Sequence, residues 1–234
     1  MDGNANYITS TTFTILSNEE VNSQSSIDIS SELMSATFRR NILNHPNFGP
    51  DPMSTQICVI CGMKYKQCNG HYGEFNNVRL YRSLFVPHIL KVLKKVCSNC
   101  KSLRNPRMNE CTVCGTNRID YSIQKQVKMY KQNKVESFKI VRDIGFMKDQ
   151  VVPREQVYEI LAGVSPEILE KLGTRVRDGT DLMWTSFPIV PKMYRKDNKV
   201  GDKIMKSHIE SLYQQMARLV SDRLANLSNV DKLA

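Results

Sequence analysis

The stretch that decides the fold is residues 58–73, which read CVICGMKYKQCNGHYG. It carries three cysteines and one histidine at Cys58, Cys61, Cys68 and His71. Three thiolates and one imidazole so close together form the ligand set of a closed tetrahedral zinc site. Gly62 directly follows the second thiolate and permits a sharp turn, and Asn69-Gly70 is a second turn signal. The sequence therefore predicts a Cys₃His zinc site here.

A second group of cysteines follows in residues 97–114 as two Cys-x-x-Cys units. Its members are Cys97, Cys100, Cys111 and Cys114. Two such units with a short spacer are a strong zinc signal. A disulfide framework or a redox Cys-x-x-Cys is the alternative, but the total of 7 cysteines fits one Cys₃His and one Cys₄ site better than full pairing. We therefore expect two structural zinc ions.

The N-terminal residues MDGNANYITS have neither the basic region nor the apolar core of a signal peptide. We accordingly expect an intracellular protein in a reducing compartment. No apolar run approaches the roughly 18 residues that a membrane span requires, so no membrane partner is expected. The hydrophobic fraction of 41% is sufficient for a packed core.

The chain of 234 residues has a formal net charge of +10, and this charge is unevenly distributed. Residues 79–148 hold 16 Lys and Arg against 4 Asp and Glu, which gives +12 and leaves −2 for the rest. A basic segment around zinc sites is typical of a surface that faces phosphates. A solvated cationic face that maintains solubility is the alternative.

The pattern of elements predicts an α+β protein with short strands, a basic helix and a β-hairpin, followed by a mainly helical part. Residues 8–16 (ITSTTFTIL) alternate as a strand, and Ser17 with Glu20 forms a capping box that begins a helix. Residues 84–96 have the apolar spacing of an amphipathic helix. Residues 119–141 alternate as a hairpin.

The last third of the chain predicts helices over 152–161, 165–172 and 204–227. The longest carries an apolar stripe that we expect to pack in the core: Ile209, Leu212, Met216, Leu219, Val220 and Leu224. Asp178 and Asp181 are expected to form a turn rather than a metal-binding pair. His45 and His88 are expected to be structural, because both four-ligand sites are already complete.

Lysines on the predicted helix and hairpin are candidate contacts to nucleic acid: Lys91, Lys94, Lys95, Lys125, Lys128, Lys131 and Lys134. The hairpin could lie on a nucleic-acid backbone or be a soluble edge, and the residues leave both open.

The motifs divide the chain into three parts. Residues 1–57 form a strand, a helix and a proline-rich lead-in, residues 58–148 form a double zinc-binding basic module, and residues 149–234 form a helical part ending in a long amphipathic helix.

The order of these motifs resembles the N-terminal clamp region of the largest subunit of multisubunit DNA-directed RNA polymerases, of the eukaryotic, archaeal and large-DNA-virus type. The family's zinc segment, Cys-x₂-Cys-x₆-Cys-x-Gly-His-x-Gly, is matched by residues 58–73. ILSNEEV at 15–21, VYEILAGVSPEILEKLG at 157–173 and FPIVPKMYR at 187–195 are similar to other family segments, more loosely. Asn69 stands where the family usually has proline. The stretch between Cys100 and Cys111 is also short compared with the family's usual second zinc site.

The resemblance implies a structural clamp element that grips DNA within a nucleotidyltransferase, with contacts to phosphates rather than bases. The family's catalytic loop, Asn-Ala-Asp-Phe-Asp-Gly-Asp, is absent from these residues, and no Asp-x-Asp-x-Asp occurs. Two-metal phosphoryl chemistry needs such carboxylates. We therefore expect this chain to be non-catalytic by itself, with the catalytic magnesium on another part of the subunit or on a partner chain. The implied partners are other polymerase subunits, including the one carrying that loop, and DNA.

Two other functions are compatible with the motifs. One is a stand-alone zinc-ribbon transcription factor that binds nucleic acid. The other is a zinc enzyme, but this would need an open metal position and a general base, and Cys₃His and Cys₄ sites offer neither. The Lys-, Asn- and Ile-rich composition and the short second site favour a viral enzyme, located in the virion or host cytoplasm. A cellular polymerase subunit would be nuclear.

Overall fold

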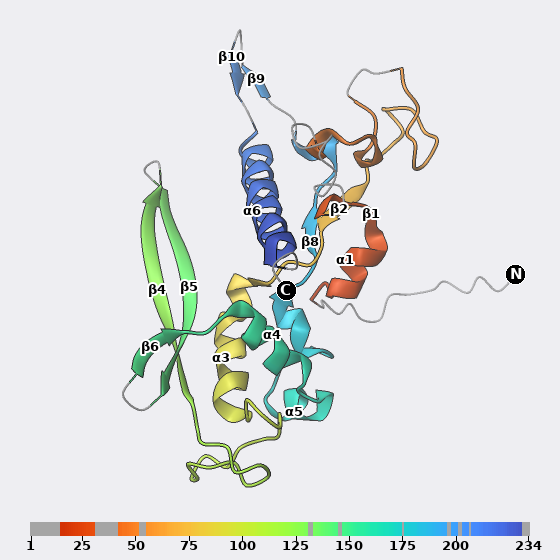
Figure 1. Ribbon diagram of the computed structural model, residues 1–234. Helices are drawn as coiled ribbons and strands as arrows, with labels where there is room; N and C mark the ends of the chain where they lie inside the picture. Colours follow the sequence, from red (N-terminus) through yellow and green to blue (C-terminus); the bar gives the residue numbers. More distant parts are fainter. Residues whose placement is uncertain are drawn as a thin grey trace, which may run out of the picture.

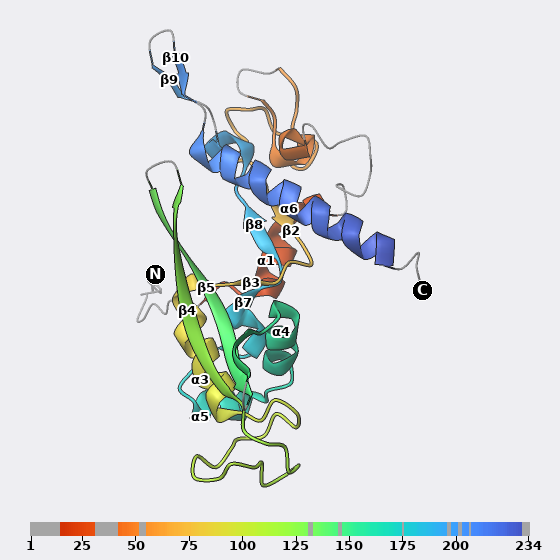
Figure 2. The same ribbon diagram turned by 60° about the vertical axis from the view of Figure 1, so that its left-hand side comes forward.

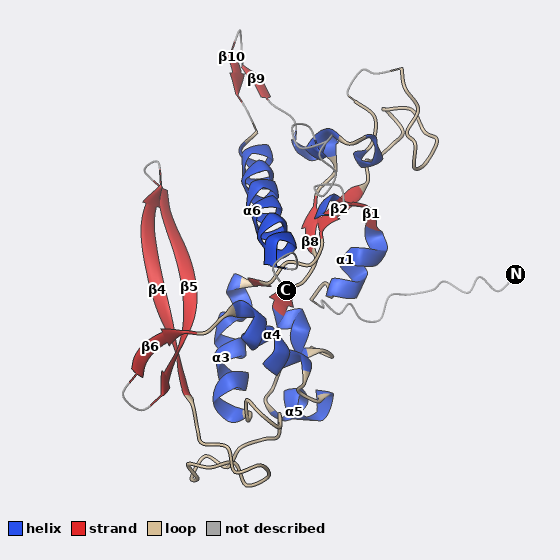
Figure 3. Ribbon diagram, in the orientation of Figure 1, coloured by secondary structure: helices blue, strands red, loops and turns tan. Residues whose placement is uncertain are grey.

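The computed structural model describes residues 15–30, 42–51, 55–130, 133–144, 147–174, 176–195, 198–200, 203–205 and 207–230. Helices and short strands are both present along this length, and Figure 3 shows them in separate colours. The predicted α+β class is therefore confirmed. No helix among these residues is both long and apolar enough to cross a membrane.

One half of the molecule is built on a small three-stranded sheet. Its central strand β2 (Tyr72–Phe75) pairs in parallel with β1 (Ser25–Asp28) and antiparallel with β8 (Phe187–Ile189). The long helix α6 (His208–Val230) crosses this region (Figure 2). The buried side chains of this first core are Ile27, Ile29, Leu43, Phe48, Phe75, Val78, Ile189, Tyr213 and Ala217.

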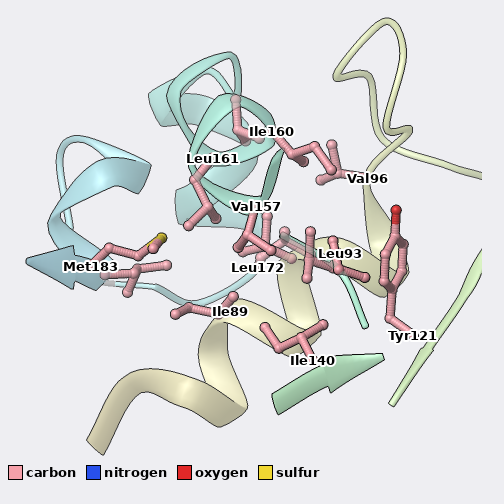
Figure 4. Close-up of a cluster of buried hydrophobic side chains, with 14 of the residues drawn as sticks. Ile89, Leu93, Val96, Tyr121, Ile140, Val157, Ile160, Leu161, Leu172 and Met183 are labelled. Atoms are coloured by element: carbon pink, nitrogen blue, oxygen red, sulfur yellow. The ribbon is translucent and has the colours of Figure 1, made fainter. Parts of the chain in front are cut away.

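The other half is built on three helices: α3 (Val86–Lys95), α4 (Arg154–Ala162) and α5 (Pro166–Lys171). Figure 4 shows the second core, in which Ile89 and Leu93 of α3 meet Val157 and Leu161 of α4. Both halves combine residues from before and after residue 148. The three-part division along the sequence stays a prediction.

The predicted β-hairpin is confirmed. Strand β4 (Asp120–Tyr130) pairs antiparallel with β5 (Asn133–Ile144), and Figure 1 shows the pair as a long ribbon beside α3. Tyr121 and Ile140 are buried at its base and attach it to the second core. A third strand, β6 (Met147–Val151), pairs with β5. Sequence reasoning missed β6 because its central residues are polar.

The first helix begins as its capping box predicts. In α1 (Asn18–Gln24) the Ser17 hydroxyl accepts the Glu20 backbone N–H at 3.0 Å, and the Glu20 carboxylate accepts that of Ser17 at 2.7 Å. The predicted strand over 8–16 falls almost entirely outside the described residues.

Short elements complete the frame. Strands β3 (Leu80–Tyr81) and β7 (Met183–Trp184) pair, as do β9 (Asn198–Val200) and β10 (Lys203–Met205). Single 3₁₀ turns occur at Ile42–Asn44, Pro46–Phe48, Ser83–Phe85, Gly179–Leu182 and Lys192–Arg195. Helix α3 therefore begins two residues later than residue 84, after a 3₁₀ turn, and α6 begins at His208 rather than at residue 204, because Ile204 lies in β10.

The apolar stripe predicted as the core face of α6 is wrong in part. Three of its members are exposed: Ile209, Leu212 and Leu219. Among the side chains of α6 that the structure describes, Tyr213 and Ala217 are buried, with Met216 and Val220 packed beside them. The Tyr213 hydroxyl accepts the Val190 N–H at 3.2 Å, and this contact helps to determine which face of the helix is turned toward the core. The side chain of Leu224 lies outside the described residues.

Candidate metal centres

The first group of candidate ligands converges as the spacing predicts. Cys58, Cys61, Cys68 and His71 place their ligand atoms within 4.8 Å of one another. Cys68 Sγ lies 3.6 Å from His71 Nε2. A tetrahedral zinc ion with Zn–S bonds of about 2.3 Å and Zn–N bonds of about 2.0 Å separates such atoms by about 3.6 Å. The donor set and the spacing therefore fit zinc.

Two tight turns bring these ligands together. The Gly62 N–H donates to the Cys58 carbonyl at 2.9 Å, and Gly62 has a φ of 68°. Gly70 has a φ of 75° and its N–H donates to Cys68 Sγ at 3.3 Å. Only glycine adopts this backbone conformation at little cost. Both turn signals identified in the sequence are therefore used.

The second group also converges. Cys97, Cys100, Cys111 and Cys114 place their sulfur atoms within 4.8 Å of one another. The Cys97–Cys114 and Cys100–Cys111 sulfur pairs are each 3.6 Å apart. A tetrahedral ZnS₄ site separates its sulfurs by about 3.8 Å, whereas a disulfide requires about 2.05 Å. All seven cysteines are free thiols in this structure, so the geometry favours metal binding over the disulfide alternative.

Three Cys-x-x-Cys turns share one backbone design. In each, the N–H four residues after the first cysteine donates to that cysteine's carbonyl, at 2.9, 3.0 and 2.8 Å in chain order. The donor residue has a positive φ each time, and the three are Gly62, Lys101 and Gly115. Lys101 is the exception, because this conformation has a steric cost for a residue other than glycine. Its aliphatic chain passes over Gly163, where a side-chain carbon would lie 2.6 Å from Lys101 Cγ.

The environment of the thiols differs from ligand to ligand within each group. At Cys58, burial is outweighed by hydrogen bonds at Cys61 and Ile60, which lower the pKa of Cys58. At Cys100, the Ser102 hydrogen bonds are outweighed by burial and the neighbouring thiols of Cys114 and Cys111, which raise the pKa of Cys100. Burial raises the pKa of the Cys68 thiol to about 11. A hydrogen bond with the Thr116 side chain lowers the pKa of Cys114 to about 5, and one with the Val113 backbone lowers the pKa of Cys111 to about 7. Metals bind the thiolate. The fold therefore favours the ligand form at Cys111 and Cys114.

Residues around the second group were missed by sequence reasoning. Ser102 Oγ lies 2.9 Å from Cys100 Sγ, and Thr116 Oγ1 lies 3.1 Å from Cys114 Sγ. The signal that could have found them is a repeat, since CSNCKS at 97–102 and CTVCGT at 111–116 both end in a hydroxyl residue.

His45, His88, Asp178 and Asp181 have structural contacts, as expected. His45 Nδ1 accepts the Asn47 N–H at 3.3 Å, and the His88 ring lies 5.9 Å from that of Phe85. Asp178 accepts the Thr180 N–H at 2.8 Å. Asp181 accepts the backbone N–H of Asn18 at 2.9 Å. Asp178 and Asp181 thus stabilise a turn and its contact with α1.

The candidate nucleic-acid contacts are described in part. Lys91, Lys94 and Lys95 are exposed on α3, away from its buried face, and Lys125 is exposed on β4. Lys94 and Lys95 also lie in the last turn of α3, where positive charge is favoured by the helix dipole. The side chains of Lys128, Lys131 and Lys134 lie outside the described residues. Contact of any of these lysines with nucleic acid stays a prediction.

Comparison with known proteins supplies one further finding. No protein-family profile matches the chain. The chain is similar to a probable DNA-directed RNA polymerase II subunit RPB1 homolog of Invertebrate iridescent virus 6, with 23% identity over 240 residues. The similarity covers 86% of this chain but only 23% of the viral protein. The chain thus spans about a quarter of the length of that relative.

Proposed function

We propose that this chain is part of the largest subunit of a multisubunit DNA-directed RNA polymerase and forms a zinc-bound clamp element that holds DNA. The observation that carries the proposal is the similarity to a viral RPB1 homolog over 86% of the chain. The convergence of two four-ligand groups supports it as well, because each has the donor set of a structural zinc site, which the polymerase resemblance implies.

The zinc ions have a structural role in this proposal. Each group offers four protein ligands, which fills a tetrahedral coordination shell and leaves no position for water or substrate. The loops that carry them have almost no core of their own. In residues 55–69 only Cys58 and Cys68 are buried, and in residues 98–118 only Cys111 is buried. Metal binding must therefore supply most of the folding energy of these loops.

The basic surface supplies the grip on DNA in this proposal. The lysines of α3 and the hairpin would contact phosphates, which binds a duplex without reading its sequence. The catalytic magnesium ions would be held by the acidic loop of another part of the enzyme, and the chain would assemble with the other polymerase subunits and DNA.

Affinity purification from the native source tests this proposal. A tagged chain is expected to co-purify with polymerase subunits, including a polypeptide that carries the acidic magnesium loop, as identified by mass spectrometry. Metal analysis of the same material should give two zinc ions per chain. Recovery of the chain as a free monomer that binds nucleic acid by itself would contradict the proposal.

A further inference from the structure

Two hydroxyl groups lie against the thiolates of the second metal group. Ser102 Oγ is 2.9 Å from Cys100 Sγ, and Thr116 Oγ1 is 3.1 Å from Cys114 Sγ. Both hydroxyl residues stand two positions after the second cysteine of their turn. Their own backbone carbonyls accept the N–H of Cys97 and Cys111, each at 2.9 Å. The turn itself therefore holds each hydroxyl next to its sulfur.

The direction of these hydrogen bonds follows from their surroundings. Thr116 Oγ1 lies 3.3 Å from the side-chain amide nitrogen of Asn99, which can only donate. The Thr116 oxygen therefore accepts from Asn99, and its own hydrogen is left for Cys114. A metal-bound thiolate has no hydrogen and can only accept, so the hydroxyls must be the donors.

The guanidinium of Arg104 also lies against the second metal group. Arg104 Nη2 lies 3.8 Å from Cys97 Sγ and donates to the carbonyls of Thr116 and Asn117 at 3.1 and 2.9 Å. A Zn²⁺ ion with four thiolates carries a net charge of about −2, against about −1 for three thiolates and a neutral imidazole. The second group therefore has more negative charge to stabilise, and charge-assisted hydrogen bonds are the strong ones.

The first group contains a natural comparison. The carbonyl of Met63 accepts the Cys58 N–H at 2.9 Å, so Met63 occupies the position that Ser102 and Thr116 occupy in the other two turns. A thioether cannot donate a hydrogen bond. The first group consequently has no hydroxyl at the turn position that supplies one to Cys100 and Cys114.

We propose that Ser102 and Thr116 retain the metal of the second group by donating hydrogen bonds to the bound thiolates of Cys100 and Cys114. The bonds stabilise the negative charge on sulfur in the bound state and so slow the transfer of zinc to competing ligands. This inference rests on the zinc sites of the proposed function. It adds that hydroxyl hydrogen bonds to the thiolates help to retain the metal in the second group, whereas the first group has a methionine at the corresponding position.

Zinc transfer from the full chain to excess colorimetric chelator tests the proposal. Ser102→Ala and the isosteric Thr116→Val are each expected to accelerate the release of one zinc equivalent about tenfold, as outer-shell partners of metal ligands do, while the other equivalent leaves at its native rate. Thr116→Ser keeps the hydroxyl and should restore the native rate. Met63→Ser should slow the release of the other equivalent.

A spectroscopic readout separates this role from simple packing. In the cadmium-113-loaded chain, Thr116→Val should shift the NMR resonance of the second group and leave that of the first unchanged, and circular dichroism should show an unchanged fold. If the native chain binds two zinc ions and the variants release them at native rates, this inference is wrong and the proposed function stands. If the native chain binds fewer than two, the zinc sites of the proposed function are themselves wrong.

Discussion

Gly70 joins the first metal group to the segment that follows β8. A methyl group at Gly70 would lie 2.4 Å from Cβ of Pro191, and the backbone φ is 75°. Gly62 has a similar φ of 68°, but a methyl group there would meet nothing within 4 Å. A substitution at Gly62 therefore causes backbone strain alone, whereas one at Gly70 causes both backbone strain and steric overlap with Pro191.

We expect Gly70→Ala to lower the free energy of unfolding by about 3 kcal/mol, because it adds overpacking to strain. Gly62→Ala is the matched control and should cost about 1 kcal/mol. Urea denaturation with saturating zinc measures both. Equal losses of stability would show that the overlap with Pro191 relaxes without cost.

Glu74 is a buried carboxylate in β2 that accepts a hydrogen bond from the Ser186 hydroxyl. Burial raises the pKa of Glu74 above its ordinary value of 4.5. The folded state therefore binds this proton more tightly than the unfolded state does. The contribution of Glu74 to stability falls as the pH rises from about 4.5 through the raised pKa.

Glu74→Gln removes that titration, so its melting temperature relative to the native chain is expected to rise as the pH increases from 4.5 through the raised pKa of Glu74. Glu167→Gln is the opposite control. A hydrogen bond from Ser165 lowers the pKa of the exposed Glu167, so the stability it contributes is present above its unfolded pKa and is lost on acidification. Thermal melts on both sides of pH 4.5 measure both, and a difference that does not vary with pH for Glu74→Gln would refute the assignment.

At the scale of elements, Arg195 connects three separate segments. Its Nε donates to the Val190 carbonyl and its Nη2 to the Leu43 carbonyl, both at 2.9 Å, and its Nη1 forms an ion pair with Glu210 of α6 at 2.5 Å. The side chain is buried and its guanidinium lies 4.7 Å from the centre of the Phe48 ring. Arg195 thereby fixes α6 against the first core.

Arg195→Lys is expected to lower the free energy of unfolding by about 3 kcal/mol, because a single ammonium cannot reach acceptors in three directions and leaves buried carbonyls unpaired. Hydrogen exchange of the α6 amides should accelerate. The control is Arg118→Lys, at an exposed pair with Asp120, which should cost less than about 1 kcal/mol. Similar costs for both would contradict the role given to Arg195.

At the scale of the whole molecule, the two metal groups lie at opposite ends, as the orange and yellow-green loops of Figures 1 and 2 show. Each is attached to a different core. Gly73, next to the first group, packs tightly against Phe48 and Ile27 of the first core. Val96, which precedes Cys97, is buried in the second. Each metal group therefore stabilises a loop at its own end of the molecule.

The proposed grip on DNA predicts a salt dependence that changes with the lysines of α3. Replacing Lys91, Lys94 and Lys95 together by glutamine should weaken duplex binding for all sequences alike. The slope of log K against log salt should fall in magnitude by about 0.9 for each phosphate that the variant no longer neutralises. The measurement is a fluorescence anisotropy titration of a duplex with the assembled polymerase that contains the native or the variant chain, at several salt concentrations.

A matched control changes the same amount of charge elsewhere. Lys64, Lys66 and Lys171 are exposed lysines outside the predicted nucleic-acid contacts, and their replacement by glutamine should alter affinity much less. Equal reductions in affinity for the two triple variants would mean that α3 makes no specific contribution and that net charge alone attracts DNA.

The features that the sequence determined by itself are local. The ligand groups, the capping box of α1, the hairpin and the turn at Asp178 each depend on residues close together in the chain, whose spacing and backbone preferences are readable from the sequence. Even the missed hydroxyls of Ser102 and Thr116 follow a short repeat. Local geometry carries its own signal because few other conformations satisfy the same short segment.

Only the tertiary structure decided which distant segments meet. Asn18 binds Asp181 from 163 residues away, and Arg195 binds the carbonyl of Leu43 from 152 residues away. Contacts between distant segments also decide how β1, β2 and β8 pair and which face of α6 is buried. An apolar stripe shows that a helix has a face to bury but not what covers it, since this depends on packing across the whole chain. That is why half of the stripe predicted on α6 is exposed.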